Sequence, residues 1–123
     1  MAEHNELGKW GEKEAETLLR KKGYIILERD WHIGHRDLDI IALNEEQDTV
    51  VFIEVKTRAT DFSDPLDAVD EKKIHNLGVA ANAYVKMKNV MHELRFDIIT
   101  VVGTSAQDCH IEHIEDAFNP MFY

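Results

Sequence analysis

Three charged side chains stand inside two short apolar runs of this chain, where a buried β-strand would normally carry none. Asp39 lies in the run 38–43, and Glu54 and Lys56 lie in the run 50–57. Removing an ionised group from water costs free energy unless the group is paired or binds a metal ion. These three residues interrupt the apolar pattern of a buried strand despite that cost, so they are the first candidates for a functional site.

The polar, turn-rich segment between the two runs indicates a β-hairpin. If Asn44 pairs with Thr49, the register places Asp39 directly opposite Glu54 on the neighbouring strand. Their Cβ atoms would then be about 4.5 to 5.5 Å apart, and Lys56 would share the face of Glu54. Two carboxylates this close repel each other unless they bind a proton or a cation. Because hard oxygen ligands with room for water suit Mg²⁺ or Mn²⁺ better than Zn²⁺, the register predicts a site for one of those two ions.

The same residue types are also compatible with different chemistry. The three charges could form a buried salt-bridge cluster without a metal, although such clusters are weak stabilisers. Zinc is not expected, because the seven histidines show no ligand spacing, and His110 and His113 would face opposite sides of a strand. The single Cys109 cannot form an internal disulfide, which indicates a reducing compartment, and no base is marked for it as a nucleophile.

The chain has 24 acidic and 14 basic residues and a formal net charge of −10. This charge argues against binding nucleic acid through bulk electrostatics, since phosphate binding normally rests on a basic surface. The argument weakens if some acids are metal ligands or if the basic residues gather on one face. Candidates for such a basic face border the predicted site: Arg29, His32, His35, Arg36, Lys56, Arg58, Lys72, Lys73 and His75. A solvated scatter of charge is the alternative.

The length of 123 residues predicts a single domain, 1–123, with its core in 5–102 and a tail, 115–123, that shows no clear pattern. The sequence has no run of eighteen apolar residues and no cationic, apolar leader. We therefore expect a soluble, cytoplasmic protein with no membrane association.

Hydrophobic periodicity and turn residues predict the elements that must position the charged side chains. They are a helix over 5–22, a strand over 24–29, a polar connection at 33–36, a hairpin over 38–57, a loop over 60–65, a helix over 66–85, a central strand over 94–102 and an edge strand over 109–114. This order predicts an α/β fold, a mixed β-sheet of about five strands flanked by helices on both faces. The two strands on either side of the second helix should pair in parallel.

An acid on one strand, Glu-x-Lys on the next and a lysine in the following helix form the pattern of the PD-(D/E)xK nuclease superfamily. Within that superfamily, the chain resembles the YraN-type family of small bacterial proteins related to Holliday-junction resolvases. The matching residues, over about 5–102, are Gly8, Gly11, Glu12, Ala15, Leu19, Gly23, Tyr24, Asp37 to Ile41, Phe52 to Lys56, Arg58, Val69, Lys73, Leu77 and Arg95 to Asp97. The resemblance implies a restriction-endonuclease-like fold.

The resemblance also implies a site for phosphodiester hydrolysis. In it, Asp39, Glu54 and the backbone carbonyl of Val55 hold Mg²⁺ or Mn²⁺, and Glu12 supplies a further carboxylate from the first helix. Lys56 orients the attacking water or stabilises the transition state.

Two further assignments depend on the resemblance. Helical periodicity alone places Glu14 nearer than Glu12 to the centre of the apolar stripe, so only the resemblance favours Glu12. The contacts to nucleic acid would come from Arg36, Arg58 and Lys73. For Lys73, an ordinary solvated helical charge is the alternative.

The function implied by the resemblance is a metal-dependent endonuclease that acts on branched or damaged DNA. Two symmetric cuts need two sites related by a two-fold axis, which suggests a homodimer. The alternative is a non-catalytic nucleic-acid-binding or adaptor module on the same scaffold. The net charge favours the alternative, and so does Ile74, which stands where related nucleases often have a Gln. A protein-interaction domain with no nucleic-acid role has only the net charge in its favour.

Overall fold

A computed structural model of the chain describes residues 2–60 and 64–120, with the side chains of 2–5, 65 and 68 left out. Its elements are α1 (Ala2–Lys21), β1 (Ile25–Ile33), β2 (Arg36–Asn44), β3 (Thr49–Arg58), the short 3₁₀ helix η1 (Pro65–Ala68), α2 (Glu71–Lys88), β4 (Glu93–Gly103) and β5 (Cys109–Ile114). Residues 61–63 of the predicted loop and 121–123 of the predicted tail lie outside the described residues.

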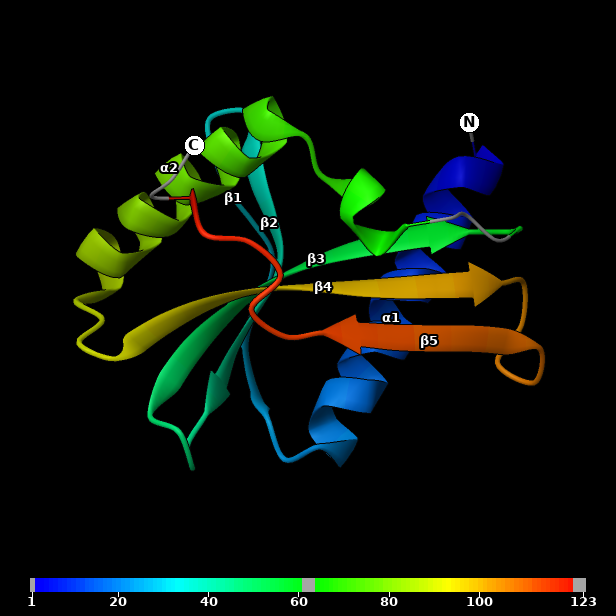
Figure 1. Ribbon diagram of the computed structural model, residues 1–123, viewed down its shortest axis with the longest axis horizontal. Coiled ribbons are helices and arrows are strands. Elements are labelled where there is room, and N and C mark those ends of the chain that lie inside the picture. Colours follow the sequence, from blue (N-terminus) through cyan, green and yellow to red (C-terminus); the bar gives the residue numbers. More distant parts are fainter. Residues whose placement is uncertain (1, 61–63, 121–123) are drawn as a thin grey trace.

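The five strands form one sheet in the order β1-β2-β3-β4-β5. Strands β1, β2 and β3 are antiparallel neighbours, β3 and β4 are parallel, and β5 runs antiparallel to β4. The parallel pair is joined through α2, as the sequence predicts. Figure 1 shows α1 and α2 on opposite faces of this twisted sheet. The predicted α/β fold, with a mixed five-stranded sheet between helices, is therefore confirmed.

Each face of the sheet buries one helix. On one face, Phe52 of β3 packs with Leu77 and Tyr84 of α2. On the other face, Val51 of β3 packs with Leu19 of α1. Because successive strand residues point to opposite faces, β3 is buried on both sides and reads as an unbroken apolar run. Full burial of a side chain the size of Phe52 stabilises the fold by about 1.5 to 3 kcal/mol.

The second predicted helix, over 66–85, divides into two pieces. Asp64 caps η1 by accepting a hydrogen bond from the backbone N–H of Leu66, and Asp70 caps α2 by accepting one from the N–H of Lys73. Each of these N-caps begins a separate helix, because it satisfies an N–H group that lacks a partner inside the helix. The longer helix therefore begins five residues later than predicted.

The first strand is longer than the sequence predicts. It continues through 30–33 to Ile33, and the polar connection shortens to a tight turn at Gly34 and His35. Gly34 has φ +61°, a conformation that glycine adopts at little cost. The turn pairs Ile33 with Arg36 and so extends the hairpin past the expected end.

Residues after β5 close the face of the sheet that carries α2. The backbone N–H of Ala117 donates to the carbonyl of Phe96 at 2.8 Å, and Phe118 is buried with its ring 5.6 Å from that of Phe96. One buried aromatic gives no periodic signal, so the sequence pattern did not show this contact. Within the described ranges, neither helix is apolar over a length that could cross a lipid bilayer.

Candidate functional site

Carboxylates from four separate elements meet beside α1. Oxygen atoms of Glu12 (α1), Asp30 (β1) and Asp39 (β2) all lie within 4.8 Å of one another. Glu54 of β3 adjoins them, close enough that the charge of Asp39 raises its pKa. We call these four residues the carboxylate cluster.

A glycine allows α1 to bring Glu12 to the carboxylate cluster. A Cβ atom built on Gly11 would lie 1.8 Å from Oγ1 of Thr57 on β3, much closer than atoms can approach. The missing side chain lets α1 pack directly against the end of β3. Glu12, the next residue, is thereby held beside the sheet, whereas a larger residue at position 11 would push the helix away.

Asp39 lies where β2 and β3 separate. The predicted pairing of Asn44 with Thr49 is confirmed, and the paired residues end at Ile40 and Ile53. One residue further on, Oδ2 of Asp39 accepts a hydrogen bond from the backbone N–H of Val55 at 2.9 Å. The carboxylate thus satisfies a backbone donor that the strand partner no longer reaches, which fixes its position.

Glu54 is 7% exposed, and its ion-pair partner comes from the helix above it. The ammonium Nζ of Lys73 on α2 lies 3.0 Å from Oε1 of Glu54. Partial burial lowers the pKa of Lys73, but the charges of Glu54 and Asp39 raise it by more, so Lys73 stays protonated. The family resemblance assigns Lys73 to nucleic acid, whereas its contact in the structure is with this carboxylate.

Burial keeps protons on the carboxylate cluster. Burial, followed by the charge of Asp39, raises the pKa of Glu54 to about 8. Burial, followed by a hydrogen bond to Asp30, raises the pKa of Glu12 to about 8. Burial also raises the pKa of Asp39, although the N–H of Val55 opposes the shift. The cluster therefore holds protons near neutral pH, because its negative charges cannot all form together without a cation.

The remaining predicted site residues lie around the cluster. Lys56 is half-buried on β3 and has no carboxylate partner within 4.0 Å among the residues that the structure describes. Arg36 donates from Nε to Oδ1 of Asn76 at 3.2 Å, and Arg58 is exposed at the end of β3. Glu14 lies outside the cluster and instead acts with burial to raise the pKa of Cys109.

Asp30 is the cluster member that sequence reasoning missed. It has φ +48°, in the left-handed region that non-glycine residues rarely adopt within a strand. The tight turn at Gly34 contained the signal, because a two-residue turn between Ile33 and Arg36 brings Asp30 opposite Asp39.

A buried ionic network between β4 and β5 was also not anticipated as a unit. Asp97 is fully buried and accepts two hydrogen bonds from Arg95, each at 2.9 Å. Nε2 of His113 lies 2.7 Å from Asp97, and the backbone N–H of Asp116 donates to it at 3.0 Å. His113 and Asp116 tie β5 and the residues after it to β4, so the network holds the end of the sheet together.

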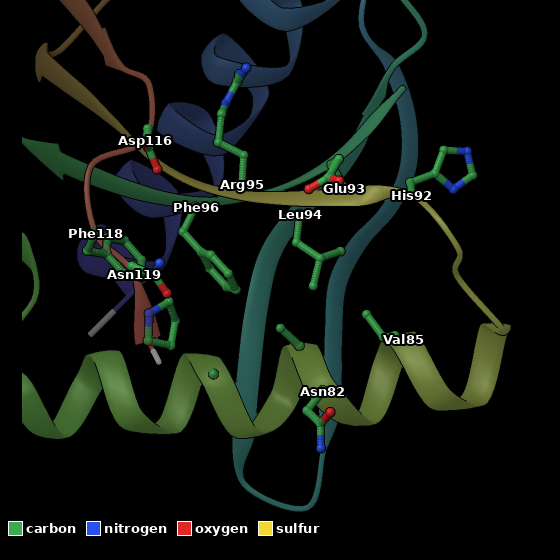
Figure 2. A pocket seen from close by; sticks show the side chains of 13 residues that line it. Asn82, Val85, His92, Glu93, Leu94, Arg95, Phe96, Asp116, Phe118 and Asn119 are labelled. Atoms are coloured by element: carbon green, nitrogen blue, oxygen red, sulfur yellow. The ribbon is translucent and has the colours of Figure 1, made fainter. Parts of the chain in front are cut away.

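Two cavities of the structure differ in the residues that line them. A cleft of about 330 Å³ contains Glu12, Asp30 and Asp39. A larger cavity, of about 580 Å³, lies between β4, α2 and the residues after β5. Figure 2 shows Leu94 and Phe96 pointing from β4 toward the helix, with Phe118 beside them. Since the larger cavity contains no member of the carboxylate cluster, its size does not make it the candidate site.

Comparison with known proteins gives the family. The model of the Uncharacterised protein family UPF0102 matches residues 11–101, which include the whole carboxylate cluster. UPF0102 proteins of Phocaeicola vulgatus and Bacteroides thetaiotaomicron are 50% and 47% identical to the chain, over 98% and 100% of both sequences. One of Flavobacterium psychrophilum is 46% identical over 96% of this chain and 98% of its own length. The chain therefore belongs to the UPF0102 family.

Proposed function

We propose that the protein is a metal-dependent endonuclease of the PD-(D/E)xK type, which hydrolyses phosphodiester bonds in branched or damaged DNA in the cytoplasm. The observation that carries the proposal is the meeting of Glu12, Asp30 and Asp39 within 4.8 Å of one another, with Glu54 close enough to Asp39 to feel its charge, where β2 and β3 separate. Glu12, Asp39 and Glu54 are the three acids that the resemblance assigns to the metal. They lie 15 or more positions apart in the sequence and come from three different elements, so local sequence alone does not bring them together.

The donor set suits a hard divalent cation. Carboxylate oxygens of Glu12, Asp30 and Asp39 lie within 4.8 Å of one another, and together with the backbone carbonyl of Val55 that the resemblance adds they match the ligands that Mg²⁺ and Mn²⁺ prefer. A bound cation of this kind makes water more acidic and stabilises the negative charge that develops on phosphate oxygens. The raised pKa values of Glu12 and Glu54 fit this assignment, because a cation removes the repulsion that burial has strengthened.

Two lysines complete the proposed site. Nζ of Lys73 lies 3.0 Å from Oε1 of Glu54 and so orients this proposed metal ligand. Lys56 follows Glu54 by two residues on β3 and shares its face, which directs its ammonium group toward the same space. Having no carboxylate partner among the described residues, Lys56 is available to a phosphate oxygen or to the attacking water.

A non-catalytic nucleic-acid-binding module is the second candidate, and one observation favours it. Ile74 is 5% exposed and packs in the core beneath α2, so the residue after Lys73 supplies no polar group to the site. The net charge of −10 also weakens nonspecific attraction to a nucleic acid.

Cleavage of defined DNA structures tests the proposal. Purified protein is incubated with a four-way junction, a flap, a duplex and a single strand, with Mg²⁺, with Mn²⁺ or with chelator. We expect cleavage only with the metal, lost in Glu12→Gln and kept in Glu14→Gln, a matched carboxylate on the same helix. Cleavage in chelator, or equal rates for the two variants, would rule the site out. Binding of the junction without cleavage would favour the second candidate.

We also propose a homodimer, because two symmetric cuts in a junction need two sites related by a two-fold axis. Light scattering should then give a mass of twice the 14.2 kDa of the chain. A mass of one chain at the concentrations used for cleavage would contradict this part of the proposal.

A further inference from the structure

Two lysines of α1 border the carboxylate cluster. Lys9 and Lys13 line the cleft of about 330 Å³ that also contains Glu12, Asp30 and Asp39. Both lysines are exposed. Because they are four residues apart on a helix, they lie on one face and about 6 Å apart along its axis.

Neither lysine forms an ion pair with the part of the chain that the structure describes. No carboxylate among the described residues lies within 4.0 Å of either ammonium group. The third cation of the cleft, Arg29, is different, because both its Nε and its Nη2 donate to Glu16. In a chain with a net charge of −10, these two neighbouring cations lie at the rim of an acidic cleft with no ion-pair partner among the described residues.

The basic residues expected to meet nucleic acid are placed differently. Lys73 is paired with Glu54, and Arg36 is bonded to Asn76. Contact with phosphate at either position would compete with an interaction that the folded protein already makes. Lys9 and Lys13 would lose only water, so they can bind phosphate at less cost than Lys73 or Arg36.

We infer that Lys9 and Lys13 bind two phosphates of the DNA strand that enters the site, next to the phosphate that is cleaved. The strand then runs along α1 and enters through the cleft between α1, β1 and β2. The inference rests on the proposed function for the reaction at the cluster. The two ammonium groups also offset the repulsion between the acidic cluster and the incoming phosphates. The negative net charge of the chain adds to that repulsion.

The salt dependence of binding measures these contacts. Each lysine that neutralises a phosphate contributes about 0.9 to the slope of log K against log salt on duplex DNA, and about 0.7 on a single strand. Changing both lysines to Gln should therefore reduce the slope by about 1.8 on duplex arms and weaken binding on the order of 10- to 100-fold at about 0.1 M salt.

The experiment measures fluorescence anisotropy of a labelled four-way junction with the full-length chain, in chelator, from low to moderate salt. The variants are K9Q/K13Q, the charge-preserving K9R/K13R, and K86Q/K88Q as a control. Lys86 and Lys88 are exposed in the last turn of α2, and their replacement changes the net charge by the same amount. Melting temperatures check that each variant is folded.

We expect the reduced slope in K9Q/K13Q only, with K9R/K13R and K86Q/K88Q close to wild type. An unchanged slope in K9Q/K13Q, an equal reduction in K86Q/K88Q, or a wild type that does not bind the junction would overturn the inference. Metal-dependent cleavage by the wild type is scored separately. If it occurs while the slope is unchanged, only the strand path is wrong. If the slope falls as expected but no cleavage occurs, the lysine contacts stand and the nuclease proposal fails.

Discussion

Replacing Glu54 by Gln should make the metal-free protein more stable at neutral pH. An unfolded Glu loses its proton near pH 4.5, whereas burial and the charge of Asp39 raise the pKa of Glu54 to about 8 in the folded protein. Between these values the folded state binds one more proton than the unfolded state. The contribution of this group to stability is therefore greatest below pH 4.5 and falls as the pH rises to about 8.

The size of the effect follows from the linkage between proton binding and folding. One retained proton changes the free energy of unfolding by about 1.4 kcal/mol per pH unit, which is on the order of 3 kcal/mol between about pH 5 and pH 7. Gln has a similar shape and does not titrate, so the variant lacks this loss. At neutral pH the protonated carboxyl group of Glu54 accepts a hydrogen bond from Lys73, and the amide oxygen of Gln can accept the same bond from this side chain, which is 48% exposed.

Urea unfolding in chelator at pH 5, 6, 7 and 8 measures the difference. The stability of Glu54→Gln relative to wild type should increase steadily across this range. Glu14→Gln removes the same charge from α1 and should show the pH dependence of the wild type. Parallel pH curves for wild type and Glu54→Gln would refute the assignment of a retained proton to this residue.

Two more substitutions test how the site and the sheet end are held. Gly11→Ala should destabilise the protein by about 1 to 3 kcal/mol in thermal unfolding, because the new methyl group meets Thr57. Helix propensity alone would stabilise the variant by about 1 kcal/mol, so an increase in melting temperature would contradict the close packing. Asp97→Asn should lower the free energy of unfolding in urea by about 3 to 5 kcal/mol, since the buried guanidinium of Arg95 loses the carboxylate charge of Asp97. Hydrogen bonds from His113 and Arg95 outweigh burial and hold the pKa of Asp97 below its usual 3.8. The stability difference between wild type and Asp97→Asn should therefore reach its full size above pH 4. It should shrink at lower pH, where the wild type also loses the charge of Asp97. An equal difference at pH 3 and pH 7 would be inconsistent with that pairing.

The sheet could be predicted from the sequence because its signals are local. The polar turn after Asn44 fixes the register of β2 on β3, and the amphipathic pattern of α2 between two apolar runs indicates a parallel crossover. Asp39 and Glu54 could be placed together for the same reason, since one hairpin carries both.

The remaining features of the site depend on tertiary packing. Asp30 joins the cluster only because β1 continues past the expected end and adopts a left-handed conformation at this residue. Lys73 reaches Glu54 because α2 lies over β3, a proximity that no sequence spacing gives. Phe118 completes the core as a single aromatic with no periodic neighbours. These contacts form between elements, and the residues around each of them carry no repeating pattern.

Calorimetric titration of Mn²⁺ at pH 7 tests most directly whether the carboxylate cluster is a metal site. Since Glu12 and Glu54 keep protons when their pKa values are about 8, a bound cation must displace them. We predict saturable binding with proton release, seen as a heat that changes with the ionisation enthalpy of the buffer, and affinity at least about tenfold lower in Glu54→Gln. Glu14→Gln should bind as the wild type does. No saturable binding, or equal affinity in Glu54→Gln and wild type, would contradict the account.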